Sequence, residues 1–377
     1  MRVLILYAKV GNGHYKAAEA IKENIKEKYP QAEIFFEDGL QYSSVITNTI
    51  AIKGYTNMVK YIPSAWGYLY YGADTKDKTA INELSKLIHK GMTIKLKKLF
   101  RQIRPDVVLS THPFVTKTCA YLKKKNKTDA KIVSLITDYA IHNMWIEDHI
   151  YLDKILVATE EMKYDCLQYG VPEKKLIVTG LPVSNNFKES YDRDETLKKY
   201  GLENKKTFLF FAGGGLGLGK SDNILRDLLE IEDDFQVVVV SGKNEKQRAK
   251  FEKIKENYSN NVVVLGYTND VPELMNMCDF VITKPGGLTS TECLYMNKPM
   301  VIINPIPGQE EQNAIFLTNN GIAVRVYDDE PFSHPINILL RNKVRVEQMK
   351  EMCKHISFPN ASDTIVRIMM DECSKSG

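Results

Sequence analysis

Short β-branched runs and amphipathic stretches alternate along the chain, and this pattern occurs twice. The first half begins with RVLILYA and continues with DVVLSTHPF, KIVSLITDY and KILVATEE. The second half contains TFLFFAG, FQVVVVSG, NVVVLGY, DFVITKPGG and PMVIINP. Stretches of helical periodicity separate these runs. Because parallel strands need crossover connections, each half predicts an α/β, doubly wound parallel sheet covered by helices.

Between the two halves lies GLPVSNNFKESYDRDETLKKY, where proline and polar residues interrupt the strand pattern and indicate a linker. A chain of 377 residues is long enough for about two domains. We therefore expect one domain over 1–188 and a second over 189–377. Two Rossmann-like domains facing each other across a cleft make the GT-B fold, in which ligands bind at the carboxyl ends of the strands.

Composition indicates a cytoplasmic protein. The longest apolar runs, VLILYA and VVVV, are far shorter than the ~18 residues of a membrane-spanning helix. Arg2 leads directly into a strand-like run without a signal-peptide cleavage site. The six cysteines form no CxxC pair, and no histidines stand at ligand spacing. We therefore expect free thiols, no disulfide framework and no zinc site.

The two halves differ in charge, although the net charge of the chain is only +4. Residues 1–188 hold 28 Lys and Arg against 19 Asp and Glu. Within residues 189–377, acidic residues therefore outnumber basic ones. Basic residues concentrate in 86–104 and 123–127, a pattern that a solvated helix face or turn also produces. A basic half is attracted to an anionic membrane surface or to nucleic acid. Because no nucleic-acid-binding module is recognisable, we expect no nucleic-acid partner.

The stretch AGGGLGLGKS at 212–221 contains the letters of a Walker A loop. A triphosphatase also needs an acidic residue that ends a neighbouring strand and holds Mg²⁺. The strands of the second half end instead in Ser241, Lys284 and Asn304. We therefore disfavour nucleotide hydrolysis, and keep Gly214 and Gly215 as residues that would face a ligand at the end of the first strand of this half.

A second glycine turn, PGGLTSTE at 285–292, offers a better diphosphate site. Gly286 and Gly287 turn the chain, and Leu288 and Thr289 would open a helix whose N–H groups hold an anion without metal. Glu292, one turn further, can accept hydrogen bonds from two ribose hydroxyls. The ordinary alternative is a capped helix with a turn.

The next motif, PIPGQEEQNA at 305–314, follows the next strand. Gln309, Glu310 and Asn313 are polar groups crowded behind a Pro-Gly turn, suited to the hydroxyls of a sugar, although a solvated loop would also contain them. Together the two motifs favour a nucleoside diphosphate sugar as the ligand.

With these motifs, the chain resembles the monogalactosyldiacylglycerol synthase family, and within it the bacterial processive diacylglycerol glucosyltransferases of glycosyltransferase family 28. The resemblance lies in GNGHYKAAEAI, YLYYGAD, LITDYAIHNMW, VTGLPV, TKPGGLTSTECL and PIPGQEEQNA. It implies a GT-B fold and an inverting transferase that uses a UDP-sugar, with no metal and no other cofactor. It also implies that the last helix, about 360–377, crosses back to the first domain.

The resemblance also assigns roles to residues. Glu292 is similar to the ribose-binding glutamate; Gly286, Gly287 and Leu288 resemble the diphosphate cradle; and Gln309 and Glu310, supported by Asn313, resemble the pair that holds the sugar. The loop with Gly214 and Gly215 would face the cleft, whereas Lys220 and Ser221 have no matched role.

The general base has two candidates. His14 closes the turn after Gly13, in a loop that borders the acceptor side in the family, and an imidazole there could take a proton from a hydroxyl. Asp138, at a strand end, is the rival, able to act directly or to orient a histidine. His112 and His142 are weaker candidates, and a structural histidine remains the ordinary alternative.

The expected acceptor is diacylglycerol, which lies in a membrane. Positions 42–71 are rich in aromatic residues, which suit the headgroup boundary but would equally pack a helical layer. The candidate membrane or acceptor contacts are Tyr61, Trp66, Tyr68 and Tyr70. We expect transfer of a hexose, glucose rather than galactose, by a protein bound peripherally to the inner face of the cell membrane. The alternatives are a UDP-sugar epimerase, a transferase with another substrate, a P-loop NTPase and a non-catalytic UDP-sugar sensor.

Overall fold

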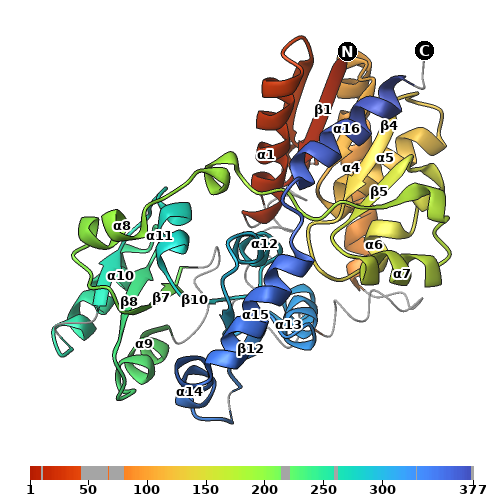
Figure 1. The fold of residues 1–377 in the computed structure, drawn as a ribbon. Coiled ribbons are helices and arrows are strands. Elements are labelled where there is room, and N and C mark those ends of the chain that lie inside the picture. Colours follow the sequence, from red (N-terminus) through yellow and green to blue (C-terminus); the bar gives the residue numbers. More distant parts are fainter. Residues whose placement is uncertain are drawn as a thin grey trace. The chain divides into compact units, whose positions relative to one another are not determined.

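The computed structural model divides the chain into two compact units (Figure 1). The described residues are 1–9, 12–43, 67, 80–213, 221–258, 262–327 and 329–374, without the side chains of 80–90. Unit 1 comprises Met1–Ser184, Ile306–Gln309 and Phe358–Gly377, and unit 2 comprises Asn185–Pro305 and Glu310–Ser357.

Unit 1 contains a parallel sheet in the order β2-β1-β3-β4-β5-β6. Its strands are β1 (Arg2–Tyr7), β2 (Glu33–Asp38), β3 (Val107–Ser110), β4 (Lys131–Leu135), β5 (Lys154–Val157) and β6 (Leu176–Val178). Val3, Leu4, Ile5 and Leu6 of β1 are all fully buried, because helices cover both faces of the central strands. The chain reverses its direction across the sheet between β1 and β3, which is where a doubly wound sheet binds ligands.

Helices connect these strands. They are α1 (Gly13–Lys28), α4 (Ala80–Ile103), α5 (Pro113–Lys124), α6 (Asn143–Ile146) and α7 (Glu160–Gln168), with the short 3₁₀ turns η1 (Gly39–Tyr42), η2 (His149–Tyr151) and η3 (Glu173–Lys175). The last helix, α16 (Ala361–Ser374), also belongs to unit 1 and packs against α1. Asn24 donates to the Asp363 carboxylate at 2.5 Å, and the Lys28 ammonium lies 2.8 Å from the same carboxylate. These polar contacts fix the C-terminal helix on unit 1.

Unit 2 contains a second parallel sheet, in the order β12-β11-β10-β7-β8-β9. Its strands are β7 (Lys206–Phe211), β8 (Phe235–Val240), β9 (Val262–Leu265), β10 (Phe280–Thr283), β11 (Met300–Ile302) and β12 (Ala323–Arg325). Its helices are α8 (Arg193–Lys199), α9 (Ser221–Leu229), α10 (Glu245–Lys255), α11 (Val271–Met277), α12 (Gly287–Tyr295), α13 (Gln309–Asn319, which belongs to unit 2 from Glu310 onward), α14 (Ser333–Arg341) and α15 (Lys343–Ile356), after the 3₁₀ turn η4 (Asn185–Lys188). The winding direction reverses between β7 and β10, so we expect a ligand at the carboxyl ends of these two strands.

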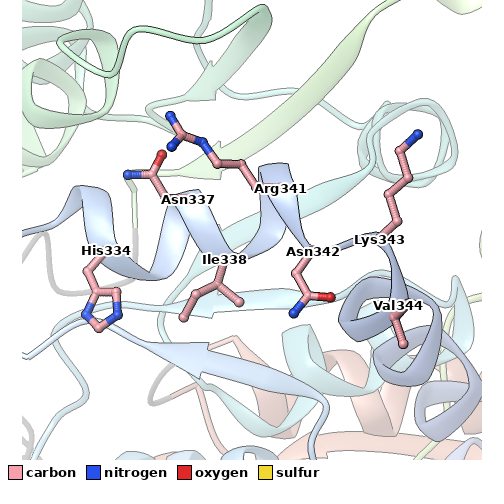
Figure 2. Close-up of a pocket in the computed structure, with 7 residues that line it drawn as sticks. All are labelled: His334, Asn337, Ile338, Arg341, Asn342, Lys343 and Val344. Atoms are coloured by element: carbon pink, nitrogen blue, oxygen red, sulfur yellow. The ribbon is translucent and has the colours of Figure 1, made fainter.

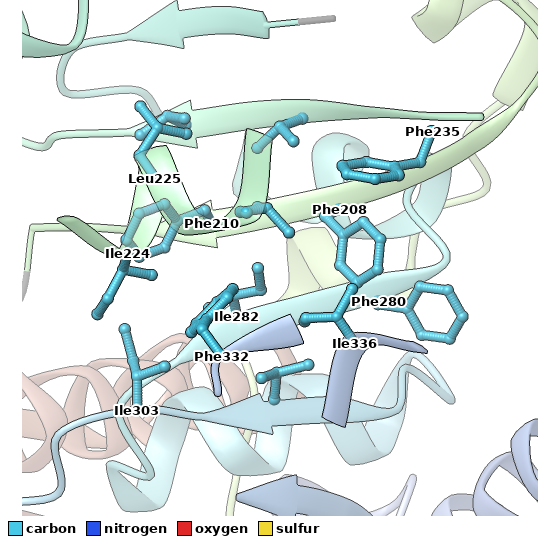
Figure 3. Close-up of a cluster of buried hydrophobic side chains, with 14 of the residues drawn as sticks. Phe208, Phe210, Ile224, Leu225, Phe235, Phe280, Ile282, Ile303, Phe332 and Ile336 are labelled. Carbon is cyan, nitrogen blue, oxygen red and sulfur yellow. The ribbon is translucent and has the colours of Figure 1, made fainter. Parts of the chain in front are cut away.

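The core of unit 2 is built on phenylalanine (Figure 3). The ring of Phe208 lies 5.4 Å from that of Phe235 and 4.9 Å from that of Phe280, centroid to centroid. Leu225 of α9 and Ile336 of α14 are fully buried in the same cluster. Burying each such side chain contributes about 1.5–3 kcal/mol, so these contacts hold α9 and α14 on the sheet.

The six cysteines are free thiols, and five of them are buried. Among the helices that the structure describes, none has an apolar stretch long enough to span a bilayer.

Candidate functional site

The carboxyl edge of the unit 2 sheet presents an open helix N-terminus. Strand β10 ends at Thr283, the chain turns through Pro285 and Gly286, and α12 begins at Gly287. The N-cap Gly286 supplies no side-chain hydrogen bond, and the first turn of α12 contains no acidic residue. The amides of this turn therefore keep the positive potential of a helix N-terminus, which attracts an anion.

Two glycines at this edge differ in what surrounds them. A Cβ added to Gly286 would meet no atom within 4 Å, and its φ of −69° suits any residue. A Cβ added to Gly213 would lie 2.4 Å from the carbonyl oxygen of Ser241. Gly213 is thus required by the packing of the loop after β7, whereas Gly286 leaves open space in front of the α12 amides.

Asn313 links the two motifs that the sequence singles out. Its side chain is fully buried, and its Nδ2 donates to the carbonyl oxygen of Pro285 at 3.0 Å. Because this amide binds the protein backbone, we assign Asn313 a positioning role, in which it holds the start of α13 against the turn at Pro285 and Gly286.

The remaining residues of these motifs lie at the starts of α12 and α13. Leu288 is buried, so it offers a ligand only its backbone, while Thr289 and Glu292 are partly exposed. Gln309 and Glu310 are also partly exposed and occupy the first turn of α13. The preceding Asn304 has a φ of +42°, an uncommon conformation that costs free energy and clusters at functional sites.

Lys284 is a residue of this edge that the sequence analysis did not assign to the site. It lies directly between β10 and the Pro285 turn and is partly buried. Burial lowers the pKa of Lys284, and the negative charge of Glu310 opposes that shift. A lysine that ends a buried strand immediately before a glycine turn is a sequence signal that could have identified it.

The carboxyl edge of the unit 1 sheet places His14 among residues from three strand ends. His14 lies in the first turn of α1, after β1, and its carbonyl oxygen accepts a hydrogen bond from the hydroxyl of Thr111 at 3.0 Å. Thr137, two residues beyond β4, places its hydroxyl 2.9 Å from Nδ1 of His14. Thr111 follows β3. Residues after β3 and β4 therefore hold His14, which follows β1, through both its backbone carbonyl and its ring.

A second imidazole lies against the first. The rings of His14 and His112 are 4.7 Å apart at 74°, and the Trp145 ring is 6.4 Å from His14. Burial lowers the pKa of His14 while the carboxylate of Asp138 partly opposes it. Burial lowers the pKa of His112 well below 6.5, and the neighbouring His14 lowers it further. Both imidazoles are therefore neutral near pH 7, the state that a general base requires.

The other candidate bases occupy different positions. Asp138 follows Thr137, is partly exposed, and acts on the charge of His14. His142 is buried as the N-cap of α6, where Nδ1 accepts a hydrogen bond from the backbone N–H of Met144 at 3.2 Å. That bond gives His142 a local structural role.

Several candidate residues lie outside the described part of the chain. Gly13 is described, as the first residue of α1. The residues that fall outside are Gly214, Gly215, Tyr61, Trp66, Tyr68 and Tyr70. Within the described ranges, no group of three or more His, Cys, Asp or Glu is arranged to hold a metal ion.

A hollow of about 640 Å³ on unit 2 contains none of the candidate residues (Figure 2). It lies at the junction of α14 and α15, and its side chains point in several directions (Figure 2). They are His334, Asn337, Ile338, Arg341, Asn342, Lys343 and Val344. Because these groups do not converge, we place the candidate site at the sheet edges.

Two family models match the chain, one in each half. Residues 14–183 match the model described as monogalactosyldiacylglycerol (MGDG) synthase. Residues 192–356 match the model described as glycosyl transferases group 1.

Curated relatives match over almost the whole chain. The processive diacylglycerol beta-glucosyltransferase of Bacillus thuringiensis (strain Al Hakam) is 31% identical over 376 residues, which covers 98% of this chain and 94% of that protein. The protein of the same name from Bacillus licheniformis is 29% identical over 374 residues, with the same two coverages.

Solved structures share the fold at low sequence identity. The crystal structure of Acinetobacter baumannii MurG superposes with a TM-score of 0.67 at 14% identity, covering 98% of this chain and 99% of that chain. The UDP-GlcNAc 2-epimerase from Neisseria meningitidis bound to UDP-GlcNAc gives a TM-score of 0.64 at 16% identity, with coverages of 98% and 100%. The S. aureus MnaA-UDP co-structure also gives 0.64 at 16%, with coverages of 97% and 94%. These likenesses confirm the predicted two-domain α/β fold of the GT-B class.

Proposed function

The chain belongs to the processive diacylglycerol β-glucosyltransferase family, and we propose that it transfers glucose from UDP-glucose to the free hydroxyl of diacylglycerol. The family follows from 31% identity over 98% of the chain. The observation in the structure that carries the proposal is the uncapped N-terminus of α12, with Glu292 one turn inside the helix.

In unit 2, we assign the donor to the α12 edge. The diphosphate would accept hydrogen bonds from the amides of Gly287, Leu288 and Thr289, because the backbone and the helix dipole favour an anion there. Glu292 would accept hydrogen bonds from both ribose hydroxyls. Gln309 and Glu310 would bind the hexose hydroxyls, held in place by the Asn313–Pro285 hydrogen bond.

In unit 1, His14 would act as the general base. In the tautomer whose Nδ1–H donates to Thr137 Oγ1, the neutral ring would carry on Nε2 a lone pair that can take the proton of the lipid hydroxyl. Asp138 would stabilise the imidazolium that forms, since its carboxylate already raises the pKa of His14 against burial. The neutral state of the imidazole near pH 7 supports this role.

The chemistry would be a single displacement that inverts the anomeric carbon. The oxygen of diacylglycerol forms a bond to C1 while the bond from C1 to the β-phosphate oxygen breaks, and that oxygen keeps the electron pair. Fixed backbone amides would stabilise the charge that develops on UDP. Because these amides and the helix dipole can perform that task, we propose that transfer needs no metal ion and no further cofactor.

Access to the acceptor would come from peripheral binding to an anionic membrane surface, at the cytoplasmic face. In α4, Ile94 is 68% exposed, and Lys95 and Lys98 beside it are exposed as well. An apolar side chain among lysines suits the boundary of an anionic bilayer. We propose that unit 1 makes this contact.

Glycolipid synthesis tests the proposal directly. The full chain would be incubated with diacylglycerol in mixed micelles and with UDP-glucose, UDP-galactose or UDP-N-acetylglucosamine, in the presence of EDTA. We expect glucosyl-diacylglycerol from UDP-glucose, and no product with triacylglycerol, which lacks a free hydroxyl. Epimerised nucleotide sugar, or phosphate released from ATP without glycolipid, would overturn the proposal in favour of an epimerase or a P-loop NTPase.

A further inference from the structure

Lys284 occupies a position at which a positive charge would face the donor. It stands at the carboxyl end of β10, beside the point where the sheet of unit 2 reverses its winding. The carbonyl oxygen of Lys284 accepts a hydrogen bond from the backbone N–H of Gly286 at 2.9 Å, so Lys284 is part of the turn that begins α12. The side chain therefore originates within one turn of the amides that the donor site requires.

Two other partly buried lysines of the chain, Lys298 and Lys175, donate to backbone oxygens. Nζ of Lys298 donates to the carbonyl oxygens of Asn276 and Cys278 at 2.9 and 2.8 Å. Nζ of Lys175 donates to three carbonyl oxygens, within 2.9 Å of each. These contacts replace the water that a buried ammonium loses.

Lys284 differs from both. Within the described ranges, its ammonium has no hydrogen-bond acceptor or ion-pair partner, and Glu310 supplies the negative charge that opposes the lowering of its pKa. An ammonium that loses part of its hydration without such partners is destabilising unless a ligand supplies them. An anionic ligand at the α12 turn would do so.

We propose that Lys284 binds the diphosphate of the nucleotide sugar directly and stabilises the negative charge that the leaving UDP acquires. The inference rests on the proposed function. It adds a side-chain cation to the backbone amides of α12 that the proposed donor site already uses. As the bond from C1 to the β-phosphate oxygen breaks, the electron pair moves to that oxygen, which the ammonium faces. The lipid hydroxyl proton goes to His14, and Lys284 keeps its own proton throughout.

The test compares UDP with uridine, because these ligands differ only in the diphosphate. Dissociation constants for both would be measured by calorimetry on the full chain and on Lys284→Met and Lys284→Arg. Met matches the length of lysine without its charge, and Arg keeps the charge. We expect Lys284→Met to weaken UDP binding by about 10- to 100-fold, with uridine unchanged and Lys284→Arg close to the parent.

Lys298→Met is the matched control, since it also removes a partly buried ammonium from unit 2. We expect it to lower the melting temperature, because two carbonyl oxygens lose their donor, and to leave the ratio of UDP to uridine affinity unchanged. The ratio cancels any general loss of folded protein. An unchanged ratio in Lys284→Met, or an equal loss for UDP and uridine, would overturn the assignment of Lys284.

Failure of the proposed function gives a different result. A parent protein that binds UDP but makes no glycolipid would refute the transfer to diacylglycerol and leave the assignment of Lys284 intact. A parent that makes glycolipid, with Lys284→Met binding UDP as tightly, would refute the assignment of Lys284 alone.

Discussion

The carboxyl edges of the two sheets are built from opposite kinds of chemistry. In unit 1, the strand ends bring together two neutral imidazoles, those of the partly exposed His14 and the buried His112, beside the carboxylate of Asp138, and burial lowers the pKa of each imidazole. In unit 2, the strand ends carry an uncapped helix N-terminus, the ammonium of Lys284 and the carboxylate of Glu310. Proton transfer needs a neutral base, whereas binding a diphosphate needs positive potential. In the proposed mechanism, the same type of sheet would thus provide a base in one unit and an anion site in the other.

The largest expected effect separates these two roles at His14. Replacing His14 with alanine removes the base, and we expect kcat to fall by about 10²- to 10⁴-fold while UDP affinity changes less than about twofold. Glycolipid formation and calorimetry on the same preparation measure the two quantities.

His142→Asn is the control for this substitution, because asparagine is also a good N-cap for α6 and should preserve activity. If Asp138→Asn abolished transfer and His14→Ala did not, the base would be Asp138. The contrast between a neutral base in unit 1 and a charged site in unit 2 would then be wrong.

The second effect lies in unit 2, at Glu292. Replacing Glu292 with glutamine removes the charge that we propose accepts hydrogen bonds from the ribose hydroxyls, and we expect UDP binding to weaken by about 10- to 100-fold. A double-mutant-type cycle tests the ribose contact by measuring UDP and 2′-deoxy-UDP binding to both the parent and Glu292→Gln. We expect 2′-deoxy-UDP to bind the parent more weakly than UDP does. We expect the substitution to weaken binding of 2′-deoxy-UDP little further. Additive losses would show that Glu292 does not contact the ribose.

The third effect compares two glycines of unit 2. Gly286→Ala adds a Cβ in open space, so we expect an unchanged melting temperature and UDP binding weakened by about tenfold, roughly 1.4 kcal/mol. Gly213→Ala should instead lower the melting temperature, because its Cβ would lie 2.4 Å from the Ser241 carbonyl oxygen. Equal UDP affinity in Gly286→Ala and the parent would place the diphosphate away from this turn.

The sequence predicts the fold of each unit well because both sheets are parallel and buried on both faces. Strands such as β1 and β8 are therefore continuous apolar runs between glycine turns, which can be recognised without long-range information. The strand-turn-helix at Gly286 and Gly287, which we propose binds the diphosphate, is recognisable for the same local reason, since these glycines stand between a strand and a helix.

Other parts of the site depend on residues that are distant in the sequence. The contact between His14 and Thr137, and the packing of His112 on His14, require the order of β1, β3 and β4 in the sheet. The strand-end position of Lys284 is visible in the sequence, but no local pattern distinguishes a hydrogen-bonded ammonium, such as that of Lys298, from one without partners. Burial decides that difference, and burial follows from tertiary packing.

The smallest effect concerns the stability of unit 1 toward acid. The folded state holds both His14 and His112 at pKa values below the ordinary 6.5, so below that pH the unfolded chain binds more protons than the folded chain. Their contribution to stability is fully present above pH 6.5 and is lost as the pH falls from 6.5 toward the lowered values. Each histidine changes the free energy of unfolding by at most about 1.4 kcal/mol per pH unit.

His112→Leu isolates one of these two contributions. His112 is 6% exposed and its Nδ1 has no hydrogen-bond partner in the described structure, so an apolar side chain of similar size should preserve or raise stability at pH 7.5. Melting temperatures between pH 7.5 and 5 should fall less steeply for His112→Leu than for the parent. The same substitution leaves the charges of unit 2 unchanged, so UDP affinity should not change. An acid slope identical to that of the parent would mean that His112 is not held neutral by burial, and the contrast between a neutral edge and a charged edge would then rest on His14 alone.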